Sequence, residues 1–408
     1  MSVHEWLIYQ GKGDPAPDRI DSLPEPPRWR RFDGTPLTGA AAEAPPLDAA
    51  STRRLGDRTA LSAQDPTSLQ LINAALYLRR PLLVTGDPGT GKSTLAHEIA
   101  YELGLGRVLQ WPVVSRTELK GGLYSYDAIG RLQDAQLYGR QEARQEARLE
   151  ARREARQEVA QELRSEARQE LRPVDGGASG DTGLDRTGGD TGRDRTGGDS
   201  GLDRTGGDTG RDRTRSDTST DIGRYVRLGP LGTALLPTVR PRVLLIDELD
   251  KSDIDLPNDL LNVVEEGEFD IPELERIADR PGQRTVDVLS DDGRRVPVTG
   301  GQVRCHAFPV IVMTSNGERE FPAPLLRRCI HVHLDPARGE RLAAMVQAHF
   351  GERADETHQD LVDLFTEDNG GELRPTDQLL NAIYLTRNAQ QQGLGRLLLR
   401  PAAEHGQR

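Results

Sequence analysis

The chain has 408 residues, of which 53 are Lys or Arg and 65 are Asp or Glu, so its formal net charge at pH 7 is −12. This acidic balance disfavours a sequence-independent DNA binder, because neutralising DNA phosphates requires a basic surface. No segment approaches the roughly 18 apolar residues of a membrane span, and Cys305 and Cys329 form neither a disulfide framework nor a metal-ligand spacing, so we expect a soluble, cytoplasmic protein.

The first part of the chain is rich in proline and lacks a regular apolar period, which predicts an extended N-terminal arm over residues 1–60. Trp6, Tyr9, Trp29 and Phe32 are its candidate anchors onto a neighbouring domain. From 68 to 79 the spacing of leucine, isoleucine and alanine favours an amphipathic helix. This helix leads into a nucleotide-binding domain that we predict over 61–335.

A glycine-rich loop follows the apolar run at 81–85. It reads Gly-Asp-Pro-Gly-Thr-Gly-Lys-Ser-Thr at 86–94, between a predicted strand and a predicted helix, and this context disfavours an incidental turn. Backbone N–H groups and the helix N-terminus would face a phosphate, Lys92 would reach the β- and γ-phosphates, and Ser93 would bind Mg²⁺. The predicted nucleotide-binding residues are Gly86, Asp87, Pro88, Gly89, Thr90, Gly91, Lys92, Ser93 and Thr94.

A low-complexity insertion interrupts this domain at 139–221. Residues 141–172 run as tetrads of the type Gln-Glu-Ala-Arg, which predicts a helix with its Glu and Arg stripes on opposite faces. Like charges four residues apart destabilise an isolated helix, so it is either a solvated helix or one that pairs with its own copy. Residues 182–217 repeat a nonapeptide four times without a recurring apolar position, and we expect them to be disordered and to bind no ligand.

Further strands are predicted at 108–114, 243–247, 309–314 and 330–334, separated by helices that include 94–103 and 256–265. This alternation is typical of an α/β fold with a parallel sheet. The strand at 243–247 ends in two carboxylates. Asp247 would hold Mg²⁺ through water and Glu248 would polarise the water that attacks the γ-phosphate, although acidic pairs at strand ends also serve as plain capping charges.

In these motifs the chain resembles the AAA+ ATPases, and more narrowly their MoxR-like branch. The resemblance is carried by Ile-Asp-Glu-Leu-Asp-Lys at 246–251, Leu-Pro-Asn-Asp-Leu-Leu at 256–261, Glu-Glu-Gly-Glu-Phe at 265–269 and Thr-Ser-Asn-Gly-Glu-Arg-Glu-Phe at 314–321. It covers about 68–390 without the insertion. It implies a P-loop NTPase sheet with flanking helices. After residue 335 the residue pattern predicts helices at 338–350, 361–365 and 375–387, which would form a small helical lid domain at 336–408.

The resemblance also implies roles for four polar residues. Asn316 fits the sensor position that orients the attacking water, although an Asn before Gly is also common in turns. Arg328 matches the arginine that completes the ATP site of a neighbouring subunit, and Arg327 stays a second choice because relatives often carry Asp there. Arg374 resembles a second sensor in the lid. For either arginine of the pair, an ordinary surface charge is the alternative.

Two segments fit insertions of the MoxR-like branch. Residues 285–298 alternate around Asp292 and Gly293, which predicts a β-hairpin just before the strand at 309–314. Residues 124–236 fall where the branch inserts a hairpin that lines the central pore, and the low-complexity insertion grows out of that element. We therefore expect the insertion to tune contact with a partner.

The sequence thus predicts an ATP- and Mg²⁺-dependent ATPase that forms a homo-oligomeric ring, expected to be a hexamer. The resemblance implies a client protein, with a von Willebrand factor A-type protein as one such partner. A nucleic-acid-dependent motor, a non-hydrolysing ATP-gated scaffold and a P-loop kinase are the alternatives. The acidic charge disfavours the first, the complete set of Lys92, Asp247, Glu248 and Asn316 disfavours the second, and the paired arginines and lid disfavour the third.

Overall fold

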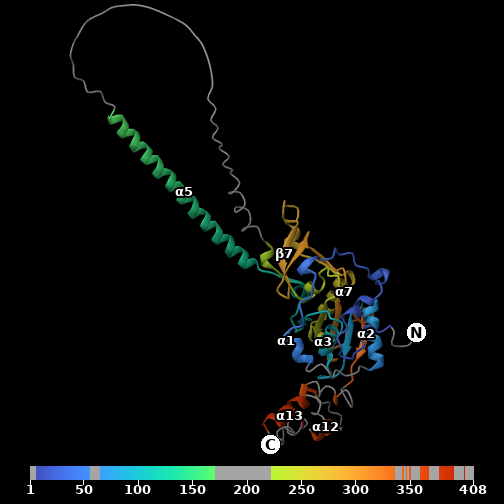
Figure 1. Cartoon of the computed structure of the whole chain (residues 1–408). Helices are drawn as coiled ribbons and strands as arrows, with labels where there is room; N and C mark the ends of the chain where they lie inside the picture. Colours follow the sequence, from blue (N-terminus) through green and yellow to red (C-terminus); the bar gives the residue numbers. More distant parts are fainter. Residues whose placement is uncertain are drawn as a thin grey trace, which may run out of the picture. The chain divides into compact units, whose positions relative to one another are not determined.

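The computed structural model of the chain describes residues 6–55, 65–170, 222–335, 342–343, 346, 349–350, 359–366, 376–389 and 399 (Figure 1). The chain divides into two compact units, one formed by Met1–Asp127 with Ile222–Arg408 and the other by Ala128–Asp221. The second unit therefore starts before residue 139, where we predicted the insertion to begin. The nonapeptide repeats at 182–217 and Arg374 lie outside the described residues.

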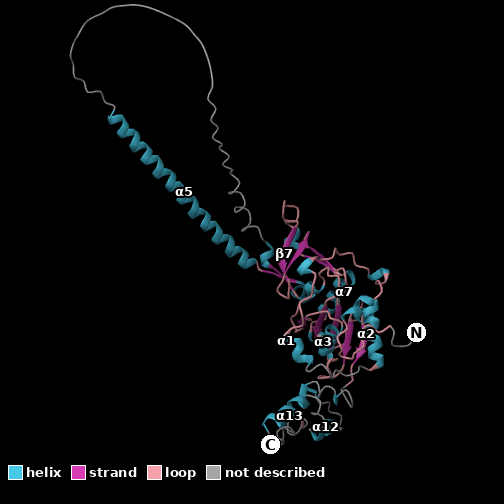
Figure 2. Ribbon diagram, in the orientation of Figure 1, coloured by secondary structure: helices cyan, strands magenta, loops and turns pink. Residues whose placement is uncertain are grey.

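A five-stranded parallel sheet forms the centre of the first unit, in the order β11-β1-β10-β5-β2 (Figure 2). All the predicted strands occur, with small shifts at their ends. Their apolar runs are buried because both faces of a parallel sheet are covered. The strands are β1 (Leu82–Thr85), β2 (Leu109–Pro112), β5 (Val243–Asp247), β10 (Val310–Ser315) and β11 (Ile330–His333).

Alternate residues of these strands enter two different cores, as the period of two along a strand requires. In β5, Leu244 and Ile246 pack in the core that contains α7 (Asp255–Glu266) and α6 (Pro230–Ala234). Val243 and Leu245 pack in the core that contains α2 (Pro66–Leu78) and α3 (Lys92–Glu102). The described body is thus a mixed α/β structure with helices on both faces of the sheet.

A second sheet has six strands in the order β3-β4-β7-β8-β9-β6. Its hairpin of β7 (Thr285–Leu289) and β8 (Arg295–Thr299) confirms the hairpin predicted over 285–298. β3 (Tyr124–Tyr126) precedes the second unit and pairs antiparallel with β4 (Val226–Leu228), which follows it. The remaining strands are β6 (Glu268–Asp270) and β9 (Gln302–Arg304).

The second unit, by itself, is described as one helix, α5 (Ala128–Glu170), of 43 residues. The observed helix therefore begins 13 residues before the helix that we predicted over 141–172. Leu149, Val159 and Leu163 on this helix are each more than half exposed. The Gln-Glu-Ala-Arg tetrads place mainly polar and charged residues around the helix, and its few large apolar side chains named here are exposed.

Short elements complete the body. They are α1 (Ala49–Leu55), α4 (Leu119–Leu123), α8 (Pro272–Glu275), α9 (Ala323–Arg328) and the 3-10 turns Pro17–Ser22, Arg28–Arg30, Gly39–Ala41, Ile222–Tyr225 and Leu249–Lys251.

Beyond residue 335 every described element is helical. α12 (Gln359–Thr366) and α13 (Thr376–Ala389) agree with two of the predicted helices, and the described residues of 338–350 are also helical. Leu361, Leu379 and Ile383 are buried together with Leu342 and Val346. These segments therefore have a small apolar core of their own.

The N-terminal arm packs along the body, and most of its predicted aromatic anchors contact it. Tyr9 is 1% exposed, Phe32 stacks on Phe308 with ring centroids 5.3 Å apart, and Trp6 meets Tyr77 edge-on at 5.6 Å. The prediction was wrong for Trp29, which is 76% exposed. Its neighbour on the chain, Arg30, is the buried residue instead.

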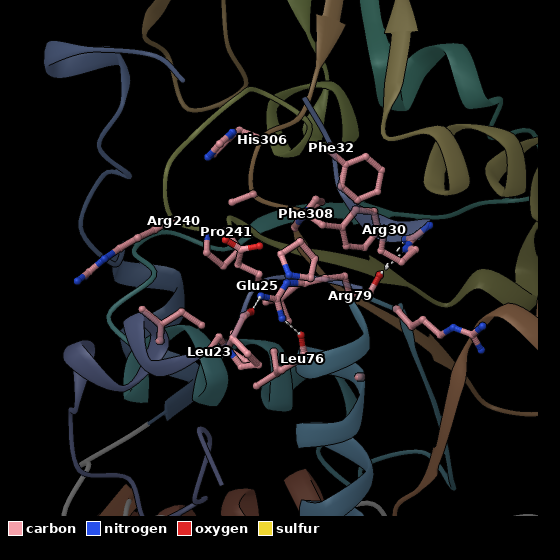
Figure 3. A pocket seen from close by; sticks show the side chains of 18 of the residues that line it. Leu23, Glu25, Arg30, Phe32, Leu76, Arg79, Arg240, Pro241, His306 and Phe308 are labelled. Atoms are coloured by element: carbon pink, nitrogen blue, oxygen red, sulfur yellow. Dashed lines mark hydrogen bonds between the residues drawn. The ribbon is translucent and has the colours of Figure 1, made fainter. Parts of the chain in front are cut away.

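The guanidinium of Arg30 packs against both rings of the Phe32–Phe308 stack, 5.2 and 4.5 Å from their centroids, and donates to carbonyl oxygens of Arg79, Val264 and Glu265. Figure 3 shows Arg30 with Phe32, Phe308 and Arg79. Arg30 lines a cavity of about 290 Å³ between the arm and the amino ends of β1 and β10. The glycine-rich loop follows the carboxyl end of β1. The cavity therefore lies at the opposite edge of the sheet from the predicted nucleotide site.

Candidate functional site

The glycine-rich loop (86–94) joins β1 to α3, as the strand–turn–helix pattern predicts. Gly86 has a φ of 147°, and a Cβ placed on it would come within 2.4 Å of the Leu334 carbonyl oxygen. Gly91 is the N-cap of α3 in the left-handed conformation, with a φ of 87°. Thr90 closes the turn by donating from its hydroxyl to the Asp87 carbonyl at 2.9 Å. These contacts require glycine at 86 and leave little freedom in the loop.

Lys92 is almost fully enclosed by this loop, with 7% of its surface exposed. Its ammonium group donates to the carbonyl oxygens of Gly86 at 2.8 Å and Asp87 at 2.7 Å. Burial lowers the pKa of Lys92, and the carboxylates of Asp87, Asp250, Asp247 and Glu248 oppose that shift. A buried cation therefore lies in the concave side of the loop, where an anion would be attracted.

The end of β5 brings Asp247 to the start of α3. Its Oδ1 accepts hydrogen bonds from the Ser93 hydroxyl at 2.6 Å and from the Thr314 hydroxyl at 2.7 Å. Three oxygen-bearing side chains from α3, β5 and β10 thus meet at one point. The structure brings together the two residues, Ser93 and Asp247, that the sequence predicted as Mg²⁺ ligands.

Glu248 follows directly in an uncommon backbone conformation, with a φ of 60°. Its N–H donates to the Thr314 hydroxyl oxygen at 2.9 Å, which holds the turn in place. The left-handed region costs a non-glycine residue about 1–3 kcal/mol, and such strain clusters at functional sites. The Glu248 carboxylate accepts a hydrogen bond from Lys251 Nζ at 2.7 Å. Both side chains are near 40% exposed, so solvent reaches this ion pair.

Asn316 lies directly after β10 and is half-buried. Its backbone N–H donates to Asp250 Oδ2 at 2.9 Å, and the N–H of Glu318 donates to the same oxygen at 3.1 Å. The predicted sensor residue is therefore tied to the segment that carries Asp247 and Glu248.

The predicted arginines lie at the end of α9 and contact other parts of the chain. Arg328 forms an ion pair with Glu265 at 3.0 Å and donates to the Pro324 carbonyl. The carbonyl of Arg327 accepts from Arg80, and both Arg327 and Arg328 are exposed. Within the described part of the chain, the hydrogen bonds and ion pairs of these two arginine side chains do not involve the glycine-rich loop.

Two residues of this site were not predicted as members. Thr314 bridges Asp247 and the N–H of Glu248, and Asp250 anchors the turn at Asn316. Both stood inside motifs that carry the family resemblance. A signal for Thr314 was present, since it is a hydroxyl residue at the end of an otherwise apolar strand.

Comparison of the chain with protein-family models and with curated proteins finds no match. None of the described helices combines the length and the hydrophobicity that a membrane span would need.

Proposed function

We propose that this chain is an ATP-hydrolysing AAA+ protein of the MoxR-like branch that remodels or matures a partner protein. The observation that carries the proposal is the hydrogen-bonded group of Ser93, Asp247 and Thr314, next to a glycine-rich loop that encloses Lys92. A hydroxyl from the start of a helix, a carboxylate from a strand end and a loop lysine are the parts that P-loop NTPases use to bind a nucleotide and its metal.

The residues fit a complex of ATP with Mg²⁺ by their chemistry. Ser93 and Asp247 offer hard oxygen donors within 2.6 Å of each other. Mg²⁺ prefers such donors, and it is usually held by one or two carboxylates together with substrate phosphates and waters. Ser93 would bind the metal directly and Asp247 through water. When bound, Mg²⁺ supplies neutralisation of charge on the β- and γ-phosphates.

The chain's own side chains then divide the work. Lys92 would exchange the carbonyl oxygens of Gly86 and Asp87 for phosphate oxygens, which suits a buried cation better than neutral acceptors do. Glu248 would polarise the attacking water, and to do so it exchanges its bond with Lys251 for one with the water. Asn316 would orient that water from the adjacent strand end.

The ring, the lid and the client follow from the resemblance. Arg328, with Arg327 as second choice, would reach the ATP site of a neighbouring subunit, and its exposed ion pair with Glu265 is weak enough to be exchanged for phosphate. Residues 336–408 would form the lid, with Arg374 contacting the γ-phosphate. In this proposal the cytoplasmic ring is a hexamer that acts on a client protein.

The test is ATP hydrolysis per subunit, measured against protein concentration for the unmodified chain, for Glu248→Gln and for Glu266→Gln as a control. Glu266 is an exposed residue of α7 outside the site. We expect specific activity to rise with concentration, no turnover by the Glu248→Gln variant despite retained ATP binding, and normal turnover by the control.

Other results would point to different functions. Absence of turnover at every concentration would refute the ATPase and support an ATP-gated scaffold. Turnover that appears only when DNA is added would support a nucleic-acid motor. Activity that is independent of concentration, in samples that are monomeric by size, would refute the shared site between subunits.

A further inference from the structure

Asp250 is a buried acidic residue to which the proposed hydrolysis assigns no role. It lies in the 3-10 turn Leu249–Lys251 that follows Glu248, and it is 2% exposed. Charged side chains are rarely buried without partners. The contacts of its two oxygens indicate what it does.

One carboxylate oxygen holds the turn that carries Asn316. Oδ2 accepts the N–H of Asn316 at 2.9 Å and the N–H of Glu318 at 3.1 Å. The N–H between them, that of Gly317, donates to the Ser315 hydroxyl at 3.0 Å, and Gly317 has a φ of 79°. Three successive N–H groups therefore have partners, and two of them converge on one anion, as in the backbone nests that bind anions in proteins.

The other oxygen makes no hydrogen bond. Oδ1 is buried and has no partner among the described residues. The hydrogen bonds that Asp250 accepts from outside its own turn thus all come from the turn that carries Asn316.

We infer that Asp250 is a positioning residue, which holds the backbone of Asn316 and Glu318 against the end of β5 so that the Asn316 amide stays in register with Glu248. This inference rests on the proposed ATPase function. A second contact joins the same two segments, since Arg319 donates to the Ser252 carbonyl at 2.9 Å. That contact lies beyond the turn, so removing Asp250 frees the turn without separating the segments.

The chemistry of the side chain defines the variants. Asp250→Ala removes the acceptor and leaves two N–H groups without it. Asp250→Asn keeps a carbonyl oxygen that can accept both N–H groups, removes the charge and replaces the unpaired Oδ1 by an amide NH2 group. Asp253→Ala is the matched control, because Asp253 is an exposed acidic residue of the same segment.

The experiment measures kcat and KM for ATP hydrolysis, and the Kd of a fluorescent ATP analogue, on the full chain and these three variants. We expect Asp250→Ala to lower kcat by about 10- to 100-fold, the loss typical of a catalytic group misplaced by about 1 Å, with KM and Kd within threefold. Asp250→Asn should restore kcat to within threefold of the unmodified chain, and Asp253→Ala should match it.

Several outcomes would overturn the assignment. These are an unchanged kcat in Asp250→Ala, an Asp250→Asn variant as defective as Asp250→Ala, and a parallel loss of kcat and nucleotide affinity. If Asp250→Ala does not fold, Asp250→Glu displaces the carboxylate by one methylene and carries the same expectation of lowered kcat with unchanged Kd. If the unmodified chain binds nucleotide but never turns it over, the proposed function fails first and the assignment fails with it, which is distinct from failure in an active enzyme.

Discussion

Replacing Arg30 by Met should release the N-terminal arm from the body of the protein. The guanidinium of Arg30 donates four hydrogen bonds to three carbonyl oxygens, those of Arg79, Val264 and Glu265, at 2.8 to 3.2 Å. Arg79 directly follows α2, and the other two residues are in the last turn of α7. One arm side chain therefore caps two helix C-termini, which favour a cation.

The expected cost follows from these contacts. Methionine retains much of the apolar stem that packs against Phe32 and Phe308 but donates a hydrogen bond to none of the three carbonyls. Each buried acceptor left unpaired costs about 1–3 kcal/mol. Water from the adjacent cavity of about 290 Å³ can hydrate some of them. Burial lowers the pKa of Arg30, which shows that desolvating its guanidinium opposes folding. The Met variant does not bury a charge, so this unfavourable contribution is absent and offsets part of the loss. We therefore expect a net loss near the lower end, about 3 kcal/mol.

The assay is equilibrium urea unfolding, with hydrogen exchange of the arm measured on the same samples. Arg31→Met is the matched control, because Arg31 is 61% exposed and pairs with Glu25, which is 81% exposed. Such a surface pair contributes about 0–1 kcal/mol. A loss below about 1 kcal/mol for Arg30→Met, or equal losses for the two variants, would refute the reasoning.

Three further predictions concern the proposed nucleotide site and the helix that follows it. Burial lowers the pKa of His97 to about 4, below the 6.5 of an exposed histidine, so the unfolded chain takes up the proton first as the pH falls. The free energy of unfolding, measured in urea, should be highest above pH 6.5 and about 2 kcal/mol lower at pH 5. The His97→Gln variant should not show this decrease. Gly86→Ala should weaken binding of a fluorescent ATP analogue at least about tenfold, because its Cβ would lie 2.4 Å from the Leu334 oxygen, and tight binding would contradict this. Arg328→Gln should lower kcat at least about 100-fold while Arg327→Gln stays within about fivefold, and equal losses would contradict the assignment.

The strands of the parallel sheet, which are covered on both faces, were the most predictable part of the fold. β5 was predicted with its observed bounds, and β10 and β1 to within one residue at each end, because strands covered on both faces read as uninterrupted apolar runs. The exposed parts were harder. We predicted that Trp29 anchors the arm because aromatic side chains in irregular segments are usually buried, but Trp29 is exposed. The buried residue is its charged neighbour, Arg30. Its burial depends on carbonyl groups of Val264 and Glu265, more than 200 residues away, which no local pattern records.

The same distinction explains which site residues could be predicted. Lys92, Ser93, Asp247 and Glu248 belong to motifs in which neighbours along the chain define the role. Thr314 and Asp250 act across strands, so their roles depend on the strand order. Because β10 lies between β1 and β5, the hydroxyl of Thr314 at its carboxyl end can reach both Asp247 and the N–H of Glu248.

That strand order also makes the strained turn at Glu248 intelligible. The left-handed Glu248 donates its N–H to Thr314 of β10. Two residues later, Asp250 accepts hydrogen bonds from the turn that follows β10. The two strand ends are thus joined twice, by side chains that do not touch solvent appreciably. The proposed hydrolysis requires the Glu248 carboxylate to point at the attacking water. If the left-handed backbone at Glu248 gives the carboxylate this direction, then the hydrogen bonds of Thr314 and Asp250 stabilise that unfavourable conformation. The residues that hold the turn should therefore matter to the rate, although less than the carboxylate whose position they fix.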